Sequence, residues 1–368
     1  MKKILIIDTT WPINSRTERF RKTLQEKYHV IVSAWKRDGK PEDPREDLHI
    51  MVNNIGYGNQ ILKLIKLPLF ILHNFNVCKK NNPDIIFASH WDSLICAAFI
   101  KALFFRRIKI IYDCLDLPTT SNYFIRKFLQ LIEKTSLKYV DITIFASRYF
   151  ESLYPKKINS IIFENYPPKS SLTPYHSQPS WFKDYDIVTI KNTKTVSWIG
   201  VVRYLNILEN ILDAIKDTDI HFLVFGTGPD LEKLQAAVIQ KNLNKQVHFF
   251  GRYEHADLNF IYSISELIWA AYPTSDHNAV YAISNKYFEC SSFEKTPIIS
   301  KKTKMAEYLR GRKNAILIDE FNVNEIRNSF FDYFNNGKDD EPFEKYEPDA
   351  SWEDRENLLI EYLEKNLP

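Results

Sequence analysis

Short apolar runs alternate with longer amphipathic segments through the first half of the chain. We predict strands at residues 3–8, 29–34, 84–88, 109–112 and 142–145. The segments between them have helical periodicity, and we predict helices at 17–27, 59–80, 94–105 and 123–138. Short buried strands separated by helices are typical of a parallel sheet with helices on both faces.

The alternation stops once and then starts again. Residues 166–184 are rich in Pro and Ser and lack helical periodicity, so we predict a domain linker there. The strands predicted after it are 194–199, 221–225, 247–250, 266–271, 297–300 and 315–318, and the helices are 206–215, 230–240, 286–293 and 323–334. The pattern therefore predicts an α/β protein with two doubly wound, Rossmann-like domains, 1–168 and 185–350. We expect them to face each other across a cleft at the carboxyl ends of their strands, where such folds bind ligands.

Length and composition fit this two-domain reading. The chain has 368 residues, which is too long for one ordinary core, and 45% apolar with 26% charged residues is typical of a globular protein in water. Four cysteines are scattered without a CxxC pair, which argues against a disulfide framework or a zinc cluster and for a reducing compartment. No apolar run reaches the roughly 20 residues that span a bilayer. We expect a cytoplasmic protein.

The charge is unevenly distributed between the two halves. Residues 1–180 hold 27 Lys and Arg against 16 Asp and Glu, whereas residues 181–368 hold 22 against 30. Three stretches of the basic half, 61–72, 99–109 and 123–129, combine apolar bulk with cations. They are either core helices with solvated lysines or surfaces that lie on an anionic bilayer, and three together favour contact with the inner face of the plasma membrane. Nucleic acid is not expected as a partner, because the cations are interleaved with aliphatic residues and no nucleic-acid motif is present.

The strongest candidate site is the segment SNKYFE at 284–289. It reads as a polar loop that opens a helix, preceded and followed by apolar strands. A helix N-terminus and Lys286 favour phosphate oxygens, and Glu289 can accept hydrogen bonds from a ribose diol. Ser284 and Asn285 belong to the same candidate nucleotide site.

Two further turns follow predicted strands of the second domain. Gly226 and Gly228 form a GxG turn, which is either a tight strand–helix turn or a phosphate contact. Gly200 precedes Arg203 in the turn before it. Arg203 is either a surface cation or a bidentate partner of diphosphate oxygens, and we favour the second reading.

Candidate catalytic residues follow strands of the first domain. His90 and Asp92 come directly after the strand at 84–88, and Asp116 follows the next strand. A histidine at such a place is as often structural as catalytic, and we expect Asp113 to be structural. A base of the Asp or His type would deprotonate an acceptor in an inverting transfer, whereas a retaining transfer needs none. The sequence leaves this choice open.

Seven stretches carry a resemblance to a known family. They are PDIIFASH (83–90), IIYDCLD (110–116), VSWIG (196–200), VFGTGP (224–229), VHFFG (247–251), SNKYFE (284–289) and GRKN (311–314). With these the chain resembles the GT-B glycosyltransferases of family 4, or group 1, that build bacterial surface polysaccharides. The resemblance implies that the second domain binds a nucleotide-sugar and the first an acceptor, and that the final helix, within 351–368, crosses back onto the first domain. It also implies that Glu289 holds the ribose and that Arg203 and Lys286 meet the diphosphate.

The chain departs from that family at two places. Tyr281 stands where the family often has a second Glu, so we expect the loop 272–278, with Asn278, to contact the sugar. The first strand is not followed by a Gly-rich loop, and Ser15 and Arg16 are candidates to meet the acceptor or the diphosphate through their side chains. The DxD-like pairs at 184–186 and 217–219 lack the context of a metal site, and we predict neither metal nor cofactor.

The sequence thus predicts a hexosyltransferase that uses a nucleoside-diphosphate sugar, with UDP preferred over GDP. The acceptor would be a glycan or a lipid-linked molecule in surface polysaccharide biosynthesis. Two alternatives remain. One is a sugar-nucleotide epimerase of related fold, which would act on the donor alone. The other is a non-catalytic nucleotide-binding subunit.

Overall fold

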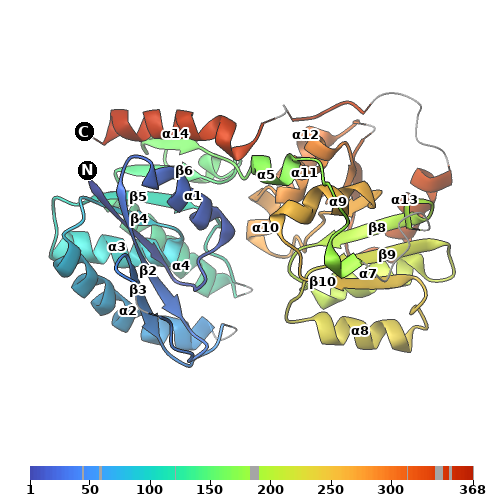
Figure 1. Cartoon of the computed structure of the whole chain (residues 1–368), viewed down its shortest axis with the longest axis horizontal. Coiled ribbons are helices and arrows are strands. Elements are labelled where there is room, and N and C mark those ends of the chain that lie inside the picture. The colour runs from blue at the N-terminus through green and yellow to red at the C-terminus, as the bar shows by residue number, and fades with distance from the viewer. Residues whose placement is uncertain are drawn as a thin grey trace. The chain divides into compact units, whose positions relative to one another are not determined.

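The computed structural model describes residues 1–43, 45–57, 60–120, 122–182, 190–312, 314–335, 343–347 and 350–367. Clustering of contacts divides the chain into two compact units (Figure 1). The first unit holds residues 1–164 and 355–368, and the second holds 165–354.

The first unit is built on a parallel sheet of seven strands in the order β3-β2-β1-β4-β5-β6-β7 (Figure 1). The strands are β1 (Lys3–Asp8), β2 (His29–Lys36), β3 (Leu48–Val52), β4 (Ile85–Ala88), β5 (Lys109–Cys114), β6 (Ile142–Phe145) and β7 (Ser160–Ile162). The longer helices are α1 (Ser15–Gln25), α2 (Gln60–Asn81), α3 (Trp91–Leu103) and α4 (Tyr123–Ser136). All five predicted strands are present, and they are the central ones, which are buried on both faces.

The second unit repeats this plan with six parallel strands in the order β10-β9-β8-β11-β12-β13 (Figure 1). The strands are β8 (Lys194–Ile199), β9 (Ile220–Phe225), β10 (Val247–Gly251), β11 (Leu267–Trp269), β12 (Thr296–Ser300) and β13 (Ile316–Ile318). The helices along this sheet are α7 (Leu205–Ile215), α8 (Leu231–Gln240), α9 (Leu258–Ser263), α10 (His277–Tyr281), α11 (Asn285–Phe293), α12 (Lys304–Leu309) and α13 (Val323–Asn335). The short helices α9, α10 and α12 were not predicted.

The described part of the predicted linker is packed rather than extended. Residues 169–172 form the short helix α5 (Lys169–Leu172). The indole of Trp181 donates a hydrogen bond of 3.0 Å to Oδ2 of Asp257, and Phe182 is fully buried. Aromatic rings pack this segment onto Phe225 and Phe250 of the second unit. The part of the predicted linker before residue 183 therefore packs onto the second unit.

The last helix, α14 (Trp352–Asn366), carries the chain out of the second unit into the first. Within the first unit, Glu356 accepts a hydrogen bond of 2.7 Å from the hydroxyl of Thr23. Tyr362 donates one of 2.6 Å to the side chain of Asn159, and Lys2 donates one of 3.1 Å to the carbonyl of Leu367. These contacts make residues 355–367 an integral part of the first unit.

Candidate functional site

The N-terminus of α11 holds the strongest candidate site. The side chain of Ser284 accepts a hydrogen bond of 3.2 Å from the amide of Lys286 and so caps the helix. The ammonium of Lys286 lies 2.5 Å from Oε2 of Glu289, three residues further along the same face. The hydroxyl of Tyr262, from α9, donates a hydrogen bond of 2.7 Å to the same oxygen.

Both charged side chains are almost completely buried, with exposures of 6% for Lys286 and 5% for Glu289. Burial favours the neutral form of Glu289, but the charge of Lys286 outweighs it and lowers the pKa of the carboxyl below its usual value. Burial likewise opposes the charge on Lys286, and Glu289 overcomes it and raises the pKa of the ammonium. Both groups are therefore charged at neutral pH.

The pairing leaves one edge of the carboxylate available. Tyr262 and Lys286 both bind Oε2 of Glu289, and among the described residues none donates a hydrogen bond to Oε1. A carboxylate held in this way is a fixed acceptor with an unused oxygen. Sequence reasoning named Lys286 and Glu289 but missed Tyr262, whose hydroxyl completes the group.

The glycine turns bring the ends of three adjacent strands together. A Cβ atom on Gly226 would lie 1.9 Å from the carbonyl oxygen of Gly200, and one on Gly228 would lie 2.2 Å from that of Val202. Backbone hydrogen bonds join the same loops, from Gly200 to Phe225 and from Val202 to Thr227. The close approach of backbone to backbone explains both glycines, so the tight-turn interpretation needs no phosphate.

Arg203 lies in the same turn region and is exposed. Its guanidinium stacks over the ring of Tyr204 at 4.7 Å. Tyr204 directly precedes α7 and has a left-handed backbone conformation, with a φ of 69°. Among the described residues, no carboxylate or carbonyl accepts a hydrogen bond from the guanidinium of Arg203. The side chain can therefore bind an anion without breaking an existing pair.

The loop between β11 and α11 is held by a buried acid, Glu320, that sequence reasoning missed. Oε1 of Glu320 accepts hydrogen bonds from the amide of Thr274 at 2.7 Å and from its hydroxyl at 2.6 Å, and Oε2 pairs with the hydroxyl of Ser300. Glu320 is fully buried and follows β13. An acid just past a predicted strand was the available signal. The predicted sugar-contacting residue Asn278 lies in this loop, in α10. Its backbone N–H donates a hydrogen bond of 2.9 Å to the side chain of Asp276, which caps that helix.

In the first unit, the structure brings the three predicted catalytic residues together. Nε2 of His90 lies 3.6 Å from Oδ2 of Asp116, and Nδ1 lies 3.8 Å from Oδ1 of Asp92. Burial lowers the pKa of the imidazole, but the two carboxylates outweigh it and raise the pKa of His90 to about 9. His90 is therefore protonated at neutral pH and is a donor, not a base.

Asp92 is also poorly suited to be a base. It is buried, and its oxygens take hydrogen bonds from the hydroxyl of Thr9 at 2.9 Å and the amide of Ser93 at 2.8 Å, while Lys63 forms an ion pair with it. Burial raises the pKa of this carboxyl, but Lys63 and His90 outweigh it and lower the pKa to about 2. Asp92 thus holds its neighbours in place as a permanent anion.

Arg16 is committed within the protein. Its guanidinium binds both oxygens of the buried Asp113, with Nε 2.9 Å from Oδ2 and Nη2 2.9 Å from Oδ1, and Nη2 also donates to the carbonyl of Phe163 at 2.6 Å. Asp113 thus has a structural role, and the guanidinium of Arg16, which we expected to meet a ligand, is bound to Asp113 instead. The neighbouring Ser15 is the first residue of α1, and its carbonyl accepts from Arg19 at 3.4 Å.

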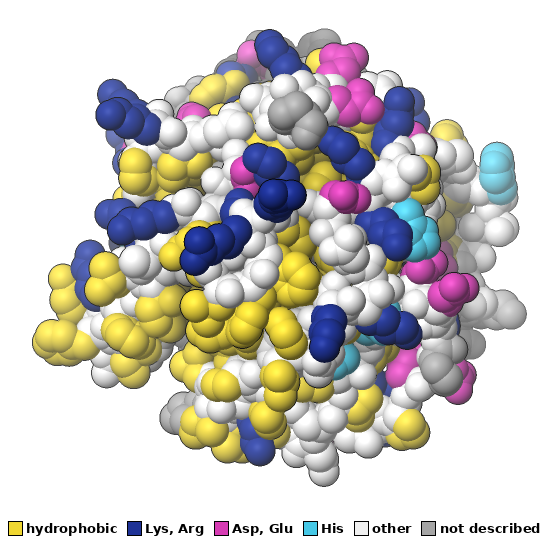
Figure 2. All heavy atoms as spheres, turned by 90° about the vertical axis from the view of Figure 1, so that its left-hand side faces the viewer, with side chains coloured by type: hydrophobic (Ala, Val, Ile, Leu, Met, Phe, Trp, Pro, Cys, Tyr) yellow, Lys and Arg dark blue, Asp and Glu magenta, His cyan; other side chains and the backbone are white. Residues whose placement is uncertain are grey.

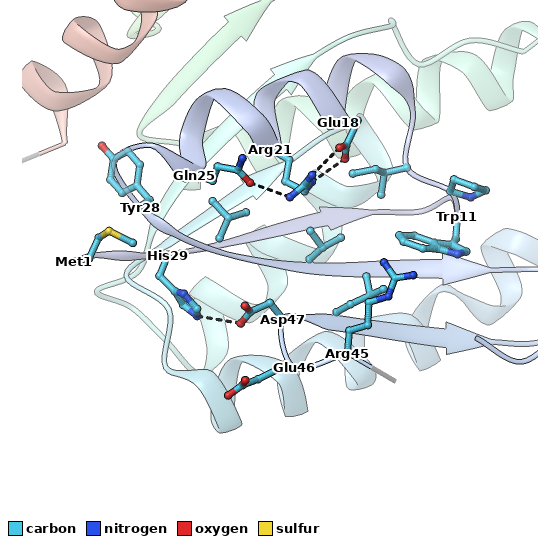
Figure 3. A pocket seen from close by; sticks show the side chains of 15 residues that line it. Met1, Trp11, Glu18, Arg21, Gln25, Tyr28, His29, Arg45, Glu46 and Asp47 are labelled. Carbon is cyan, nitrogen blue, oxygen red and sulfur yellow. Dashed lines mark hydrogen bonds and ion pairs between the residues drawn. The ribbon is translucent and has the colours of Figure 1, made fainter. Parts of the chain in front are cut away.

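A groove of about 790 Å³ lies beside α1 and β2 of the first unit (Figure 3). Several of its polar side chains are paired with one another, as Arg21 with Glu18 at 2.7 Å and His29 with Asp47 at 3.1 Å (Figure 3). The groove contains none of the predicted site residues.

Among the described residues, no group of three or more His, Cys, Asp and Glu side chains could hold a metal ion. Of the two DxD-like pairs, 184–186 lies outside the described residues. In the other, Asp219 forms an ion pair with Lys194 at 3.0 Å.

Comparison with known proteins identifies the architecture. The family "Glycosyl transferases group 1" matches residues 186–349, within the second unit. Sucrose-phosphate synthase from Thermosynechococcus elongatus is similar in structure, with a TM-score of 0.69, 14% identity and coverage of 89% of this chain and 88% of that one. Anabaena HepE, solved in complex with UDP-glucose, has a TM-score of 0.66, 13% identity and coverage of 91% and 90%.

A third similar structure is an E. coli protein described as trehalose-6-phosphate and bound with UDP-2-fluoro glucose. Its TM-score is 0.63 at 9% identity, and the match covers 100% of this chain and 95% of that one. No curated protein matched the sequence. The solved structures confirm the predicted α/β fold class, with two sheets of parallel strands as in GT-B glycosyltransferases, and the family match covers the second unit.

Proposed function

We propose that the chain, whose second unit matches the group 1 glycosyltransferase family and whose fold is that of GT-B glycosyltransferases, transfers a sugar from a nucleoside-diphosphate sugar, with UDP as the nucleotide, to a glycan or lipid-linked acceptor of surface polysaccharide biosynthesis. The single observation that carries the proposal is the buried group of Lys286, Glu289 and Tyr262 at the N-terminus of α11. Two structurally similar proteins were solved with UDP-sugars, which supports UDP.

In this proposal, Glu289 receives the ribose. Its free Oε1 accepts hydrogen bonds from the ribose diol, and Lys286 and Tyr262 keep the carboxylate charged and in one orientation. Ser284 and Asn285 place the first amides of the helix toward the nucleotide. Asn278 meets the sugar from the loop that Glu320 anchors.

The diphosphate leaving group needs positive charge as the bond to the sugar breaks. Arg203 provides a guanidinium without another anionic partner among the described residues, and the N-terminus of α11 adds partial positive charge. Gly226 and Gly228 let the loop after β9 approach the loop after β8 closely, and this contact fixes the backbone position of Arg203. With these cations, we propose that transfer proceeds without a metal ion or another cofactor.

On the acceptor side, we propose that His90 acts as an imidazolium. Its raised pKa, about 9, suits a group that donates a hydrogen bond to an acceptor or sugar oxygen and stabilises negative charge there. Asp116 keeps a side-chain exposure of 44%, so it is the carboxylate available if the transfer inverts and requires a base. Asp92 positions His90, and Ser15 remains a candidate contact for the acceptor or the diphosphate. Arg16 has no ligand-binding role in this proposal, because its guanidinium is paired with Asp113.

The first unit also exposes an apolar and basic surface that suits an anionic bilayer. Along α4, Phe124, Phe128 and Leu131 recur at helical spacing and point to solvent, with exposures of 81%, 60% and 61%. Lys127 and Lys134 flank this stripe and are exposed. Hydrophobic side chains gather on the face of the molecule in Figure 2, with Lys and Arg beside them.

This surface continues onto neighbouring helices. Helix α3 contacts both α2 and α4, and α2 exposes Ile65, Leu69 and Leu72. No helix among the described residues is long and apolar enough to span a bilayer. We propose that the first unit rests on the inner face of the plasma membrane, where a lipid-linked acceptor would be located.

Vesicle binding tests this location. Replacing Phe124 and Phe128 by serine removes two side chains that would each contribute roughly 1.5 kcal/mol or more when buried in the interface, so binding to phosphatidylglycerol vesicles should weaken at least about tenfold. The matched control is Ile239→Ser, which removes an equally exposed apolar residue from α8 of the second unit. Equal binding by all three proteins would refute the membrane surface.

A product assay tests the transfer itself and separates it from the two alternatives. The protein is incubated with UDP-glucose, UDP-galactose or UDP-N-acetylglucosamine, with and without a bacterial membrane-lipid fraction, and products are identified by mass spectrometry and chromatography. The proposal predicts UDP release together with a glycosylated product only when lipid is present. A new sugar isomer without acceptor would indicate an epimerase, and binding without any product would indicate a non-catalytic subunit.

A further inference from the structure

A second buried arginine of the first unit, Arg37, differs from Arg16 in its hydrogen bonding. Arg37 directly follows β2 and is only 3% exposed, yet its Nε and Nη1 are buried without a hydrogen-bond acceptor among the described residues. No hydrogen bond from Nη2 to a described residue is found either. Burying guanidinium N–H groups without acceptors destabilises a fold, so such a group needs an explanation.

The side chain is nevertheless held in place. Its guanidinium lies 4.7 Å from the ring centre of Tyr57 and 5.9 Å from that of Trp35. The loop that carries Tyr57 is tied down by a hydrogen bond of 2.8 Å from the amide of Gly56 to the carbonyl of Arg37, and the Tyr57 hydroxyl donates to the carbonyl of Trp11 at 2.5 Å. Arg37 is therefore fixed between two aromatic rings, with its donors unused.

Two acids lie near enough to act on Arg37 electrostatically, but neither accepts a hydrogen bond from it. Burial lowers the pKa of the guanidinium, and the carboxylates of Asp92 and Asp8 oppose this only in part. The oxygens of Asp8 are taken by Thr10 and Asn14, and those of Asp92 by Lys63, Thr9 and Ser93. The nearby anions are thus already used.

Arg16 provides an internal comparison. It is equally buried and lies in α1, after the adjacent strand β1, yet its Nε and Nη2 donate hydrogen bonds to Asp113 and Nη2 also donates to the carbonyl of Phe163. The first unit thus carries one buried arginine with a carboxylate partner and one without such a partner among the described residues. Arg16 shows how this fold satisfies a structural guanidinium, and Arg37 departs from that pattern.

A second unsatisfied donor lies at the same edge of the sheet. Strands β2, β1 and β4 are neighbours, so Arg37 and His90 both follow their carboxyl ends, with Thr9 between them after β1. Nδ1 of His90 is also buried without a hydrogen-bond partner among the described residues. Two cations with unused N–H donors at adjacent strand ends fit an anionic ligand.

We propose that Arg37, together with His90, binds a phosphate group of a lipid-linked acceptor. The inference rests on the proposed function, which assigns the acceptor to the first unit. The ligand reaches the guanidinium when the ring of Tyr57, itself 39% exposed, is displaced. The planar fork of arginine matches phosphate oxygens, and Arg37 gains the acceptors that the protein withholds.

Helix α2 connects this phosphate site with the apolar surface and supports the lipid. It supplies Lys63 to Asp92 at the strand ends, and it exposes Leu64, Ile65 and Leu69 to solvent along the same helix. A molecule with a phosphate head and a hydrocarbon tail meets both chemical requirements. A soluble phosphorylated acceptor would meet only the first.

Binding and stability measured together test the proposal. The variants are Arg37→Met, which removes the charge at similar length, Arg37→Lys, and the control Lys36→Met, which changes the preceding, partly exposed residue. Enzyme saturated with UDP is titrated calorimetrically with inorganic pyrophosphate and with decyl diphosphate below its micelle concentration. UDP saturation keeps the donor site occupied, so that the diphosphate probes report on the acceptor side.

We expect Arg37→Met to weaken decyl diphosphate binding at least tenfold without lowering the unfolding temperature, because an unsatisfied charge is removed. Arg37→Lys should recover part of the affinity, and Lys36→Met should match the wild type. Unchanged affinity with a lower unfolding temperature would overturn the proposal and make Arg37 a structural residue. Equal affinity for pyrophosphate and decyl diphosphate would overturn the lipid assignment. Failure of UDP to bind the wild type would instead count against the proposed function, and pyrophosphate titration without UDP would still test Arg37.

Discussion

Replacing Glu289 by glutamine separates the two tasks that we assign to the buried group. The amide has nearly the size of the carboxylate but no charge, so Lys286 remains buried without its counter-ion. The same change removes the charged acceptor proposed for the ribose diol. Stability and nucleotide affinity should therefore both fall, for different reasons.

The structure allows both losses to be estimated. Breaking a buried ion pair by removing one partner costs about 3–5 kcal/mol. For a domain of this size, roughly 2–4 °C of unfolding temperature is lost per kcal/mol, so we expect a decrease of about 6–20 °C. Hydrogen bonds to a charged acceptor contribute about 1.5–3 kcal/mol to binding, so losing them should raise the dissociation constant for UDP roughly 10- to 150-fold.

A double variant distinguishes the two losses. Lys286→Met with Glu289→Gln leaves no unpaired charge in the site, so the unfolding temperature should recover most of the decrease while UDP binding stays weak. Glu307→Gln is the matched control, because Glu307 pairs with Lys304 at the same spacing, 2.8 Å apart, and both side chains of that pair are exposed to solvent. Differential scanning fluorimetry and titration calorimetry measure the two quantities.

One outcome would refute this reasoning. If the double variant bound UDP as tightly as the wild type, Glu289 would be a structural partner of Lys286 and would not hold the ribose. A single variant that lost neither stability nor affinity would show that the pair is not buried in solution.

Three further predictions concern other parts of the two units. The pKa of His90 is raised to about 9 from an ordinary value near 6.5, so the protonated ring stabilises the fold fully below pH 6.5. This contribution, at most about 3 kcal/mol, is lost as the pH rises through 9. Denaturant titrations of the wild type and His90→Asn between these pH values should give free energies of unfolding that depend differently on pH, and parallel curves would contradict the assignment. Gly226→Ala should unfold the second unit or make it insoluble, because its Cβ would lie 1.9 Å from a backbone oxygen that cannot move away, and soluble expression with circular dichroism reports the result; a variant as stable as the wild type would show that the loops can separate. Glu320→Gln should loosen the loop held through Thr274 and raise the KM for the UDP-sugar more than the dissociation constant for UDP, and equal changes in both would contradict a role in sugar positioning.

The central part of both sheets could be predicted from the sequence because it is buried on both faces. Strands such as β1 and β9 read as continuous apolar runs, and the turns after them are marked by polar residues. The edge strands β3 and β7 were missed because they are short and their residues are half-buried or exposed, so neither reads as a buried apolar run. The short helices were missed because five or six residues show too little periodicity.

The candidate site residues stay predictions, and for several of them the partner inside the protein could not be foreseen from the sequence. The spacing of Lys286 and Glu289 on one helix was visible in the sequence, yet each was expected to meet a ligand rather than the other. Arg16 shows the same limit, because its partner Asp113 is distant in sequence and lies on another strand. The burial of Arg37 could not be predicted either, since it depends on Tyr57 from a separate loop.

Titration calorimetry of the wild-type protein with UDP tests the central claim most directly. The account predicts one binding site per chain, with UDP bound more tightly than GDP or CMP and with binding that is insensitive to chelation of divalent metal ions. No binding of UDP, or binding only when a divalent metal is added, would contradict it.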